Sequence, residues 1–240
     1  MNCAAWTGHP SPAATSSPAA TSSPAATSFM PAMIGHSRFG VTPMELHELE
    51  IDYGTTLIGP VSADFPAGKV TVLRGGSGRG KTTLCLAMTG FLTPTSGRIR
   101  GEPGVLVPQN PREWLNPRHT VAEVIDRTAR ILGRKLEAEE RTDIVARALL
   151  GQELLEHKCG ELSGGQAARV CLARALASGV DTIVCDEPTA ALDASNAARF
   201  ARLLSALAEA GHTIIWATHD LPLVMATNAN SRIVSLDRWR

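Results

Sequence analysis

A glycine-rich stretch of eight residues carries the sequence pattern that points most directly to chemistry. The residues are Gly75, Gly76, Ser77, Gly78, Arg79, Gly80, Lys81 and Thr82. They fit the pattern G-x-x-x-x-G-K-S/T, between a segment typical of a strand (69–73) and one typical of a helix (83–89). Glycines let the backbone wrap around a phosphate, and the positive end of the following helix faces the same anion. The pattern therefore predicts a loop that binds the phosphates of a nucleoside triphosphate.

Within this loop, two side chains are suited to act on the phosphates. Lys81 would reach the β- and γ-phosphates, and the Thr82 hydroxyl would coordinate Mg²⁺. Thr83, the next residue, is also expected to contact the nucleotide. A glycine-rich turn with a chance lysine is the alternative, and the strand–loop–helix context argues against it. Kinases, GTPases, helicases and transporters share this pattern, so the rest of the chain must decide among them.

A second chemical feature is a pair of adjacent carboxylates, Asp186 and Glu187, directly after the apolar strand predicted at 182–185. The carboxyl ends of parallel strands meet at one edge of a sheet, so this pair would lie beside the phosphate loop. Asp186 would then hold the Mg²⁺ shell, and Glu187 would polarise the attacking water. A solvated strand end explains one acidic residue, but it explains an adjacent pair less well.

The pentapeptide 162–166 separates the candidate families. Its residues are Leu162, Ser163, Gly164, Gly165 and Gln166. A serine at a cap position followed by two glycines predicts a helix start with exposed N–H groups, which is a second anion site in the same chain. This pentapeptide is the signature of the ABC ATPase family, which the sequence resembles from about residue 44 to residue 240.

The resemblance implies roles for further residues, because the motifs occur in the family's order. Gln109 matches the glutamine before the helical subdomain and is expected at the Mg²⁺ ion and in catalysis. Asp193 matches an aspartate of the dimer interface, although the family more often has serine where this chain has Ala191. His219, which alone would be interpreted as a surface histidine at a strand end, matches the family's switch histidine.

The resemblance also implies how ATP is bound. In the family, the signature of one subunit binds the γ-phosphate held by the phosphate loop of the other, so Ser163 and Gly165 are expected to act in trans. Tyr53 lies where the family often stacks adenine on an aromatic residue, a contact worth about 1–3 kcal/mol. A tyrosine packed on the sheet at a strand end is the alternative interpretation. ATP and Mg²⁺ are the expected cofactors.

Predicted strands and helices alternate along the chain, which is typical of the α/β class with a largely parallel sheet. The expected strands are 45–53, 69–73, 105–107, 182–185 and 213–217, and the expected helices start at 121, lie around 144–149, and cover 163–177 and 195–210. Residues 111–162 show no strand pattern and predict a helical insertion. The resemblance implies a P-loop NTPase (RecA-like) core with a mixed sheet in a domain of residues 44–240, with a helical subdomain at about 111–164.

The first 43 residues are expected to form a disordered, low-complexity tail. The hexapeptide Ser-Pro-Ala-Ala-Thr-Ser occurs three times in succession, from Ser11 to Ser28. Proline removes a backbone donor in each repeat, and the small side chains bury little surface. Ordering this segment would cost conformational entropy with little burial to offset it.

Composition indicates where the protein acts. Its 240 residues include 23 Lys and Arg and 23 Asp and Glu, so no excess of positive charge marks a nucleic-acid partner. No apolar run is long enough to span a bilayer. The five cysteines are scattered, which is typical of reduced residues in a cytosolic protein. We therefore expect a cytoplasmic protein, and the resemblance implies that it is attached peripherally to the inner face of the cell membrane.

Together these features predict the ATP-hydrolysing subunit of an ABC transporter that powers a separate membrane permease, with peptide or metal (nickel) import as one hypothesis for its cargo. The expected partners are membrane permease subunits, a second ATPase subunit in a homodimer or heterodimer, and a substrate-binding protein. Soluble ABC proteins of repair, translation or cofactor assembly are the alternative, but they usually carry two cassettes, coiled-coil insertions, zinc motifs or basic surfaces. A catalytically silent subunit is a third hypothesis, and the intact Glu187, His219 and Ser163 argue against it.

The sequence after Gln109 offers hints about substrate and partner. Residues 115–118, Leu-Asn-Pro-Arg, resemble a stretch in the peptide and nickel importer group. The chain ends soon after residues 232–236, without the extension of many peptide-importer subunits, so a shorter metal or peptide subunit is expected; cobalt and vitamin uptake systems remain open. The segment from Pro111 is expected to dock a permease through Trp114 and Leu115, which would otherwise pack inside the helical subdomain.

Overall fold

The computed structural model of the protein describes residues 43–52, 57–227 and 231–238. All of them belong to one of two units of the chain, Gly35–Arg240. Residues 1–42 of the tail that was expected over residues 1–43 lie outside the described residues. Tyr53, expected at the adenine base, also lies outside them.

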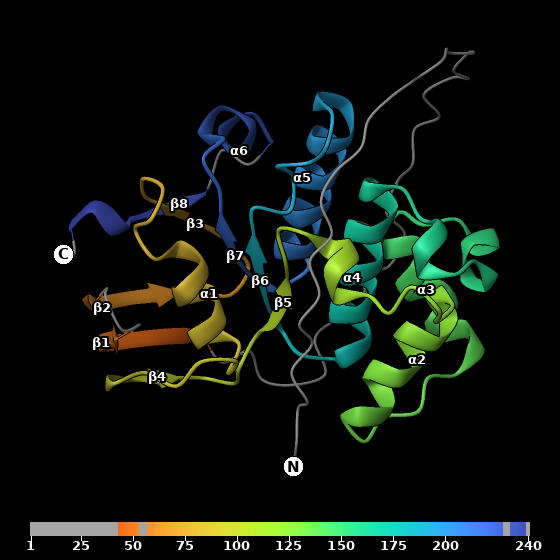
Figure 1. The fold of residues 1–240 in the computed structure, drawn as a ribbon, viewed down its shortest axis with the longest axis horizontal. Coiled ribbons are helices and arrows are strands. Elements are labelled where there is room, and N and C mark those ends of the chain that lie inside the picture. Colours follow the sequence, from red (N-terminus) through yellow and green to blue (C-terminus); the bar gives the residue numbers. More distant parts are fainter. Residues whose placement is uncertain (1–42, 53–56, 228–230, 239–240) are drawn as a thin grey trace, which may run out of the picture. The chain divides into compact units, whose positions relative to one another are not determined.

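A five-stranded parallel sheet forms the centre of the described structure, with the strand order β5-β6-β7-β3-β8 (Figure 1). Its strands are β3 (Val70–Arg74), β5 (Val105–Val107), β6 (Thr182–Asp186), β7 (Thr213–Ala217) and β8 (Arg232–Ser235). Since every pair in this sheet is parallel, the segments that follow β3, β6 and β7 emerge at the same edge. That edge is where the residues of the phosphate loop and the acidic pair come together.

Helices lie on both faces of the parallel sheet. They are α1 (Lys81–Met88), α2 (Val121–Ile131), α3 (Ala138–Arg147), α4 (Gly164–Ser178), α5 (Ala194–Glu209) and α6 (Leu221–Thr227). Short 3₁₀ turns are η1 (Pro111–Trp114), η2 (Gln152–Glu156), η3 (Cys159–Glu161) and η4 (Leu236–Arg238). Among the described residues, no helix is long and apolar enough to cross a membrane.

Side-chain alternation along the central strands divides the interior into two cores. On β6, Ile183 and Cys185 pack into the core that includes α4 and α5, whereas Val184 packs into the core that includes α1. On β7, Trp216 faces the first core and Ile215 faces the second. Because both faces are buried, these strands consist almost entirely of apolar residues, which is why they could be predicted from the sequence.

A separate antiparallel sheet with the order β2-β1-β4 packs on the α1 side. Its strands are β1 (Met44–Asp52), β2 (Leu57–Phe65) and β4 (Ser96–Arg100). The expected mixed sheet is therefore two sheets, one parallel and one antiparallel. Strands β2 and β4 were missed because β2 contains Gly59 and Pro60, which weaken the strand pattern, and because β4 is mostly exposed and polar.

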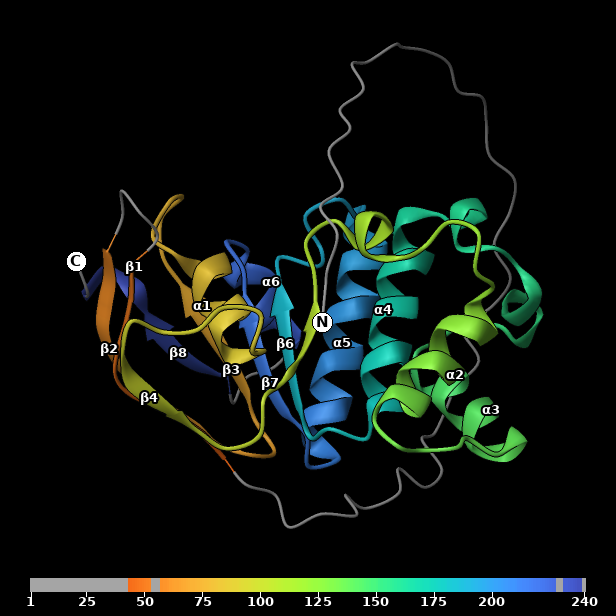
Figure 2. The same cartoon turned by 60° about the horizontal axis from the view of Figure 1, so that its bottom comes forward.

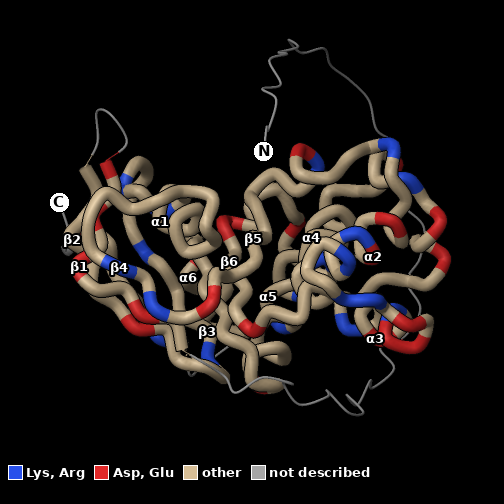
Figure 3. Tube along the Cα trace, turned by 90° about the horizontal axis from the view of Figure 1, so that it is seen from below, with Lys and Arg blue, Asp and Glu red and all other residues tan. Residues whose placement is uncertain are grey.

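The expected helical insertion is present, and residues 111–162, all described, contain no strand apart from a single bridge between Thr120 and Lys158. Helix α2 begins at a capping box, in which the Thr120 hydroxyl accepts from the Glu123 backbone and the Glu123 carboxylate accepts from the Thr120 backbone. Figure 2 shows α2 and α4 side by side. Acidic and basic residues both occur over α2 and α3 (Figure 3).

We predict that Ile125→Ala lowers the free energy of unfolding by about 2–5 kcal/mol, because Ile125 on α2 is fully buried in the core shared with α4. Ile131→Ala is the matched control. Its side chain is 71% exposed on the same helix, so a change within about 0.5 kcal/mol is expected. Urea denaturation of both variants measures the difference. Equal losses in the two variants would contradict the packing of α2 described here.

Candidate active site

The glycine-rich loop joins β3 to α1 and places the first residue of α1, Lys81, beside the sheet edge. Gly80 precedes the helix with a φ of 82°, a left-handed conformation that glycine adopts without strain. A β-carbon on Gly80 would stand 2.3 Å from the Ile58 side chain on β2. The antiparallel sheet therefore supports the loop from outside, through a residue that sequence reasoning missed together with β2.

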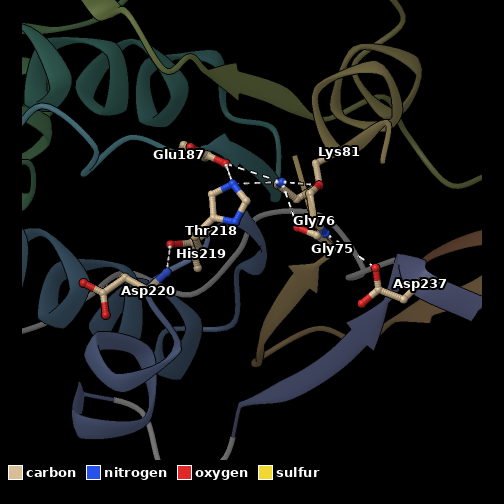
Figure 4. A network of polar contacts seen from close by, with 8 residues as sticks. All are labelled: Gly75, Gly76, Lys81, Glu187, Thr218, His219, Asp220 and Asp237. Carbon is tan, nitrogen blue, oxygen red and sulfur yellow. Dashed lines mark hydrogen bonds and ion pairs between the residues drawn. The ribbon is translucent and has the colours of Figure 1, made fainter. Parts of the chain in front are cut away.

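The ammonium group of Lys81 lies at the centre of a polar cluster (Figure 4). Its Nζ donates to the carbonyl oxygens of Gly75 (3.0 Å) and Gly76 (3.2 Å). The same nitrogen is 3.6 Å from Glu187 Oε1 and 3.1 Å from His219 Nε2. Lys81 is only 6% exposed, so these partners replace the water that its charge has lost. Three motifs distant in sequence thus meet at one cation.

Glu187 reaches this cluster from the end of β6 by an unusual backbone turn. Its φ is 45°, in the left-handed region that residues other than glycine rarely adopt. A hydrogen bond from its N–H to the Ala217 carbonyl (2.9 Å) holds the turn against the end of β7. As a result, the carboxylate points to the neighbouring loop, where Oε1 lies 2.8 Å from His219 Nε2. Neutral Nε2 can accept from Lys81 or donate to Glu187, but not both at once.

Asp186, the last residue of β6, lies deeper than Glu187 and is 5% exposed. Burial raises the pKa of its carboxyl group, and a hydrogen bond with the Thr82 side chain opposes that rise. Its Oδ1 atom is buried and has no hydrogen-bond partner among the described residues. A buried carboxylate oxygen without a donor, next to a threonine hydroxyl, fits the oxygen ligands that Mg²⁺ prefers.

A cavity of about 340 Å³ opens at this edge of the sheet. It is lined by Ile58, Ser77, Gly78, Gly80, Lys81, Thr82, Thr83, Gln109, Glu187 and His219. Gln109 enters it from the segment after β5, as the motif order predicts. The cavity combines a cation, backbone N–H groups at a helix start and a carboxylate, which suits an anionic ligand and a polarised water.

Arg79 and the first two glycines of the loop, Gly75 and Gly76, do not line the cavity. Arg79 Nε lies 3.9 Å from Asp237 Oδ1, and the Gly76 N–H points to the same oxygen at 3.5 Å. Arg79 is therefore directed toward η4 rather than into the cavity. Gly75 and Gly76 contribute their carbonyl oxygens to Lys81, so they shape the site through Lys81.

The signature residues Ser163–Gln166 do not line this cavity in the described structure. They begin α4 with a capping box, in which the Ser163 hydroxyl accepts from the Gln166 N–H (3.2 Å) and the Gln166 side chain accepts from the Ser163 N–H (2.8 Å). Ser163 is exposed. Asp193, also exposed, caps α5 by accepting from the Asn196 N–H (2.9 Å). These residues thus form a second set, separate from the cavity.

A phosphate loop on a parallel sheet, followed along the chain by a helical insertion and then an acidic pair, defines a P-loop nucleoside triphosphatase. Comparison with known proteins gives the family, because the profile of the ABC transporter family matches residues 58–190, more than half of the chain. The protein belongs to the ABC transporter family, as one of its ATP-binding, ATP-hydrolysing members.

Two curated relatives illustrate the similarity. The zinc import ATP-binding protein ZnuC of Photobacterium profundum is 32% identical over 192 residues, which is 79% of this chain and 73% of the relative. The aliphatic sulfonates import ATP-binding protein SsuB of Granulibacter bethesdensis is 36% identical over 208 residues, covering 83% of this chain and 82% of the relative.

Solved structures show the same fold. CbiO1 of Clostridium perfringens, part of the ABC transporter complex cbiONQ, has a TM-score of 0.66 and 28% identity over 79% of this chain and 83% of that chain. The dimeric structure of MJ0796, a bacterial ABC transporter cassette, has a TM-score of 0.67 and 25% identity over 80% of this chain and 94% of that chain.

The relatives correct one expectation from the sequence, the grouping with peptide and nickel importers. The similar proteins are named for zinc and for sulfonates, not for peptides or nickel. The Leu-Asn-Pro-Arg stretch forms a local turn instead, in which the Asn116 side chain accepts from the Arg118 N–H (3.0 Å) and the His119 N–H donates to the Asn116 carbonyl (3.1 Å). Turn geometry accounts for these residues without any contribution from the substrate.

We predict that Lys81→Ala weakens ATP binding by at least about tenfold and leaves the fold intact, because Lys81 offers charged hydrogen bonds to the phosphates rather than apolar packing. Lys69→Ala, at an exposed position before β3, is the control and should bind ATP like the unmodified protein. Titration with a fluorescent ATP analogue, together with circular dichroism, measures both effects. Unchanged affinity in folded Lys81→Ala would remove the phosphate-loop assignment.

Proposed function

We propose that this protein is the ATPase subunit of an importer, and that it drives a separate membrane permease by closing around ATP with a second subunit. The observation that carries this proposal is the cluster of Lys81, Glu187 and His219 at the phosphate loop, with the signature cap at Ser163 exposed elsewhere on the same chain. Each chain thus has one nearly complete ATP site at its phosphate loop. It also has a second helix N-terminus, at Ser163, that could bind an anion held by another chain. The function would reside in residues 44–240, with the helical subdomain at about 111–164.

Different residues of the cavity have different roles in ATP binding and hydrolysis. Lys81 and the loop N–H groups bind the β- and γ-phosphates. Thr82, Asp186 and Gln109 would hold Mg²⁺, which supplies charge neutralisation at the phosphates when bound. The unpartnered Asp186 Oδ1 supports this assignment.

Glu187 polarises the attacking water, and His219 holds Glu187 in place. When Lys81 turns to the phosphates, His219 Nε2 loses its donor and becomes free to donate to Glu187, 2.8 Å away. Nucleotide binding therefore favours one tautomer of His219 and one orientation of the carboxylate. This orientation makes Glu187 the general base that best fits the geometry.

A second subunit completes the site. Ser163 and Gly165 would present hydroxyl and N–H groups to the γ-phosphate bound by the partner, and Asp193 would lie at the interface. Exposure of the Ser163 cap and its absence from the chain's own cavity support an arrangement in trans. ATP would favour the closed pair because only that state makes both sets of phosphate contacts. The dimeric structure of MJ0796, an ABC transporter cassette, supports the pairing of two such subunits.

The permease would dock beside η1, where an aromatic pair is exposed. Trp114 is 40% exposed and packs edge-to-face on Phe91, itself 63% exposed, with 5.4 Å between the ring centroids. Leu115, expected as a second anchor, is instead 5% exposed and belongs to the core that includes α4. The docking hypothesis therefore rests on Trp114 and Phe91. Such docking would hold the protein at the inner face of the membrane.

Import is favoured by the relatives, which are named as import proteins for zinc and for sulfonates. These cargoes differ in charge and size, yet the relatives have similar ATPase chains. This is understandable if cargo is recognised by the permease and a substrate-binding protein. A motor of this kind needs no cargo-specific residue of its own.

We predict that Glu187→Gln keeps ATP binding but lowers hydrolysis by about 10²–10⁴-fold, the usual contribution of a positioned general base. The variant should accumulate as an ATP-bound dimer, detected by size-exclusion chromatography with and without ATP. Glu209→Gln, at the exposed end of α5, is the control and should hydrolyse ATP at the normal rate. Glu187→Gln with wild-type turnover would contradict the catalytic assignment.

Trp114→Ala should weaken co-purification with the permease and leave the basal ATPase rate unchanged, with only a small fall in melting temperature from the lost contact with Phe91. Leu115→Ala should do the reverse, lowering stability by about 2–5 kcal/mol because its side chain is buried. Pull-down from co-expressing cells and thermal melts separate the two effects. Permease binding that survives the loss of both Trp114 and Phe91 would place the docking surface elsewhere.

A further inference from the structure

The turn η1 makes two contacts with the signature helix α4 and a third with Leu162, the residue before the cap of that helix. Arg112 Nη2 donates to the Leu162 carbonyl at 2.5 Å. Arg174 Nη1, from α4, donates to the Trp114 carbonyl at 3.3 Å, and Cys171 Sγ, also from α4, lies 3.9 Å from the Pro111 carbonyl. Figures 1 and 2 both show the turn after β5 against α4. These contacts involve both ends of η1, so η1 and α4 should move together.

Of the three contacts, the one made by Arg112 is placed closest to the signature. Leu162 is 1% exposed and directly precedes Ser163, the cap of α4. Arg174 and Cys171 hold the turn two or more helical turns further along α4. A guanidinium donates in a fixed plane, so its bond to the Leu162 carbonyl orients the peptide that leads into the cap. Arg112 therefore holds the carbonyl oxygen of the residue that directly precedes the Ser163 cap.

The other end of η1 reaches the cavity. Gln109 lines the cavity beside Lys81 and Glu187, two residues before Pro111. The 3₁₀ turn closes tightly, with the Glu113 N–H donating to the Asn110 carbonyl at 3.1 Å. A short, closed turn transmits displacement better than an open loop would. The path from the cavity to the signature thus runs from Gln109 through η1 and Arg112 to Leu162 and Ser163.

We infer that Arg112 is a positioning residue that couples the nucleotide in a chain's own cavity to the signature that this chain presents to its partner. The inference rests on the proposed function, because it gives the Gln109 and Ser163 of one chain roles in two different ATP sites. Nucleotide contact shifts Gln109, η1 carries that shift, and the Arg112 bond moves the Ser163 cap. By linkage, the affinity of each site then depends on the occupancy of the other.

The test uses the full chain carrying Glu187→Gln as the parent, with Arg112→Ala and Arg112→Lys added separately. Glu113→Ala is the matched control, because this exposed residue lies in the same turn and its side chain makes none of the three contacts. Three measurements are made on each protein. They are the affinity of the monomer for a fluorescent ATP analogue, ATP-dependent dimerisation by sedimentation, and hydrogen exchange at residues 162–166 with and without ATP.

Arg112→Ala is expected to bind the analogue with unchanged affinity, yet to lose the ATP-dependent change in exchange at residues 162–166. Its dimerisation should weaken by about tenfold, within the usual range of a coupling between two sites, because the signature no longer responds to the nucleotide. Arg112→Lys should recover part of both effects, since it keeps the charge but not the planar donor. Glu113→Ala should behave like the parent.

Failure of the inference and failure of the proposed function give different results. If the parent dimerises with ATP and Arg112→Ala matches it in exchange and dimerisation, the coupling role is wrong and the two-chain site stands. Reduced monomer affinity in Arg112→Ala would also overturn the inference, since it would show a general structural role. If the parent binds ATP but stays monomeric, the two-chain site fails. Hydrogen exchange at residues 162–166 of the monomer then tests the coupling role of Arg112. If ATP changes the exchange in the parent but not in Arg112→Ala, the coupling role is supported, and any other result overturns it.

Discussion

The buried ammonium group of Lys81 is the interaction on which the rest of the site depends. A cation that is only 6% exposed requires partners, and two loop carbonyls, Glu187 and His219 provide them. These partners come from segments that follow three different strands. The cluster therefore fixes the relative positions of the phosphate loop, the acidic pair and the histidine before any nucleotide arrives. A ligand with negative charge can replace Glu187 and His219 around Lys81 without leaving the cation unpaired.

The parallel sheet makes this meeting possible. Strands β3, β6 and β7 are neighbours in register, so the residues that follow Arg74, Asp186 and Ala217 leave the sheet at one level. The antiparallel sheet adds support from one side through Ile58, and the segment after β5 adds Gln109 from the other. The site is thus built from the ends of sheet strands. The parts proposed to move are η1 and the helical insertion, and they join the site through Gln109 at its edge.

The sequence predicted those parts whose local pattern is strong. Buried parallel strands such as β6 and β7 are mostly apolar, and the loop from Gly75 to Thr82 has the spacing expected of a phosphate loop between a strand and a helix. It did not predict β2 and β4, because edge strands with glycine, proline or exposed polar residues carry little periodic signal. Contacts between distant segments, such as Arg112 with Leu162 or Ile58 with Gly80, leave no mark in either local sequence. The error on Leu115 has the same origin, since a leucine in a polar neighbourhood is equally compatible with a surface and with a core.

The backbone conformation of Glu187 limits which substitutions this position can accept. A left-handed conformation at a residue with a β-carbon costs about 1 kcal/mol that glycine would not incur. Glycine would relax this position, yet it would remove the carboxylate. Removing the side chain would also take one partner from the buried Lys81 ammonium, so the backbone relief and the lost ion pair oppose each other at this one residue. The carboxylate is therefore kept at a small cost in backbone energy while it balances the charge of Lys81.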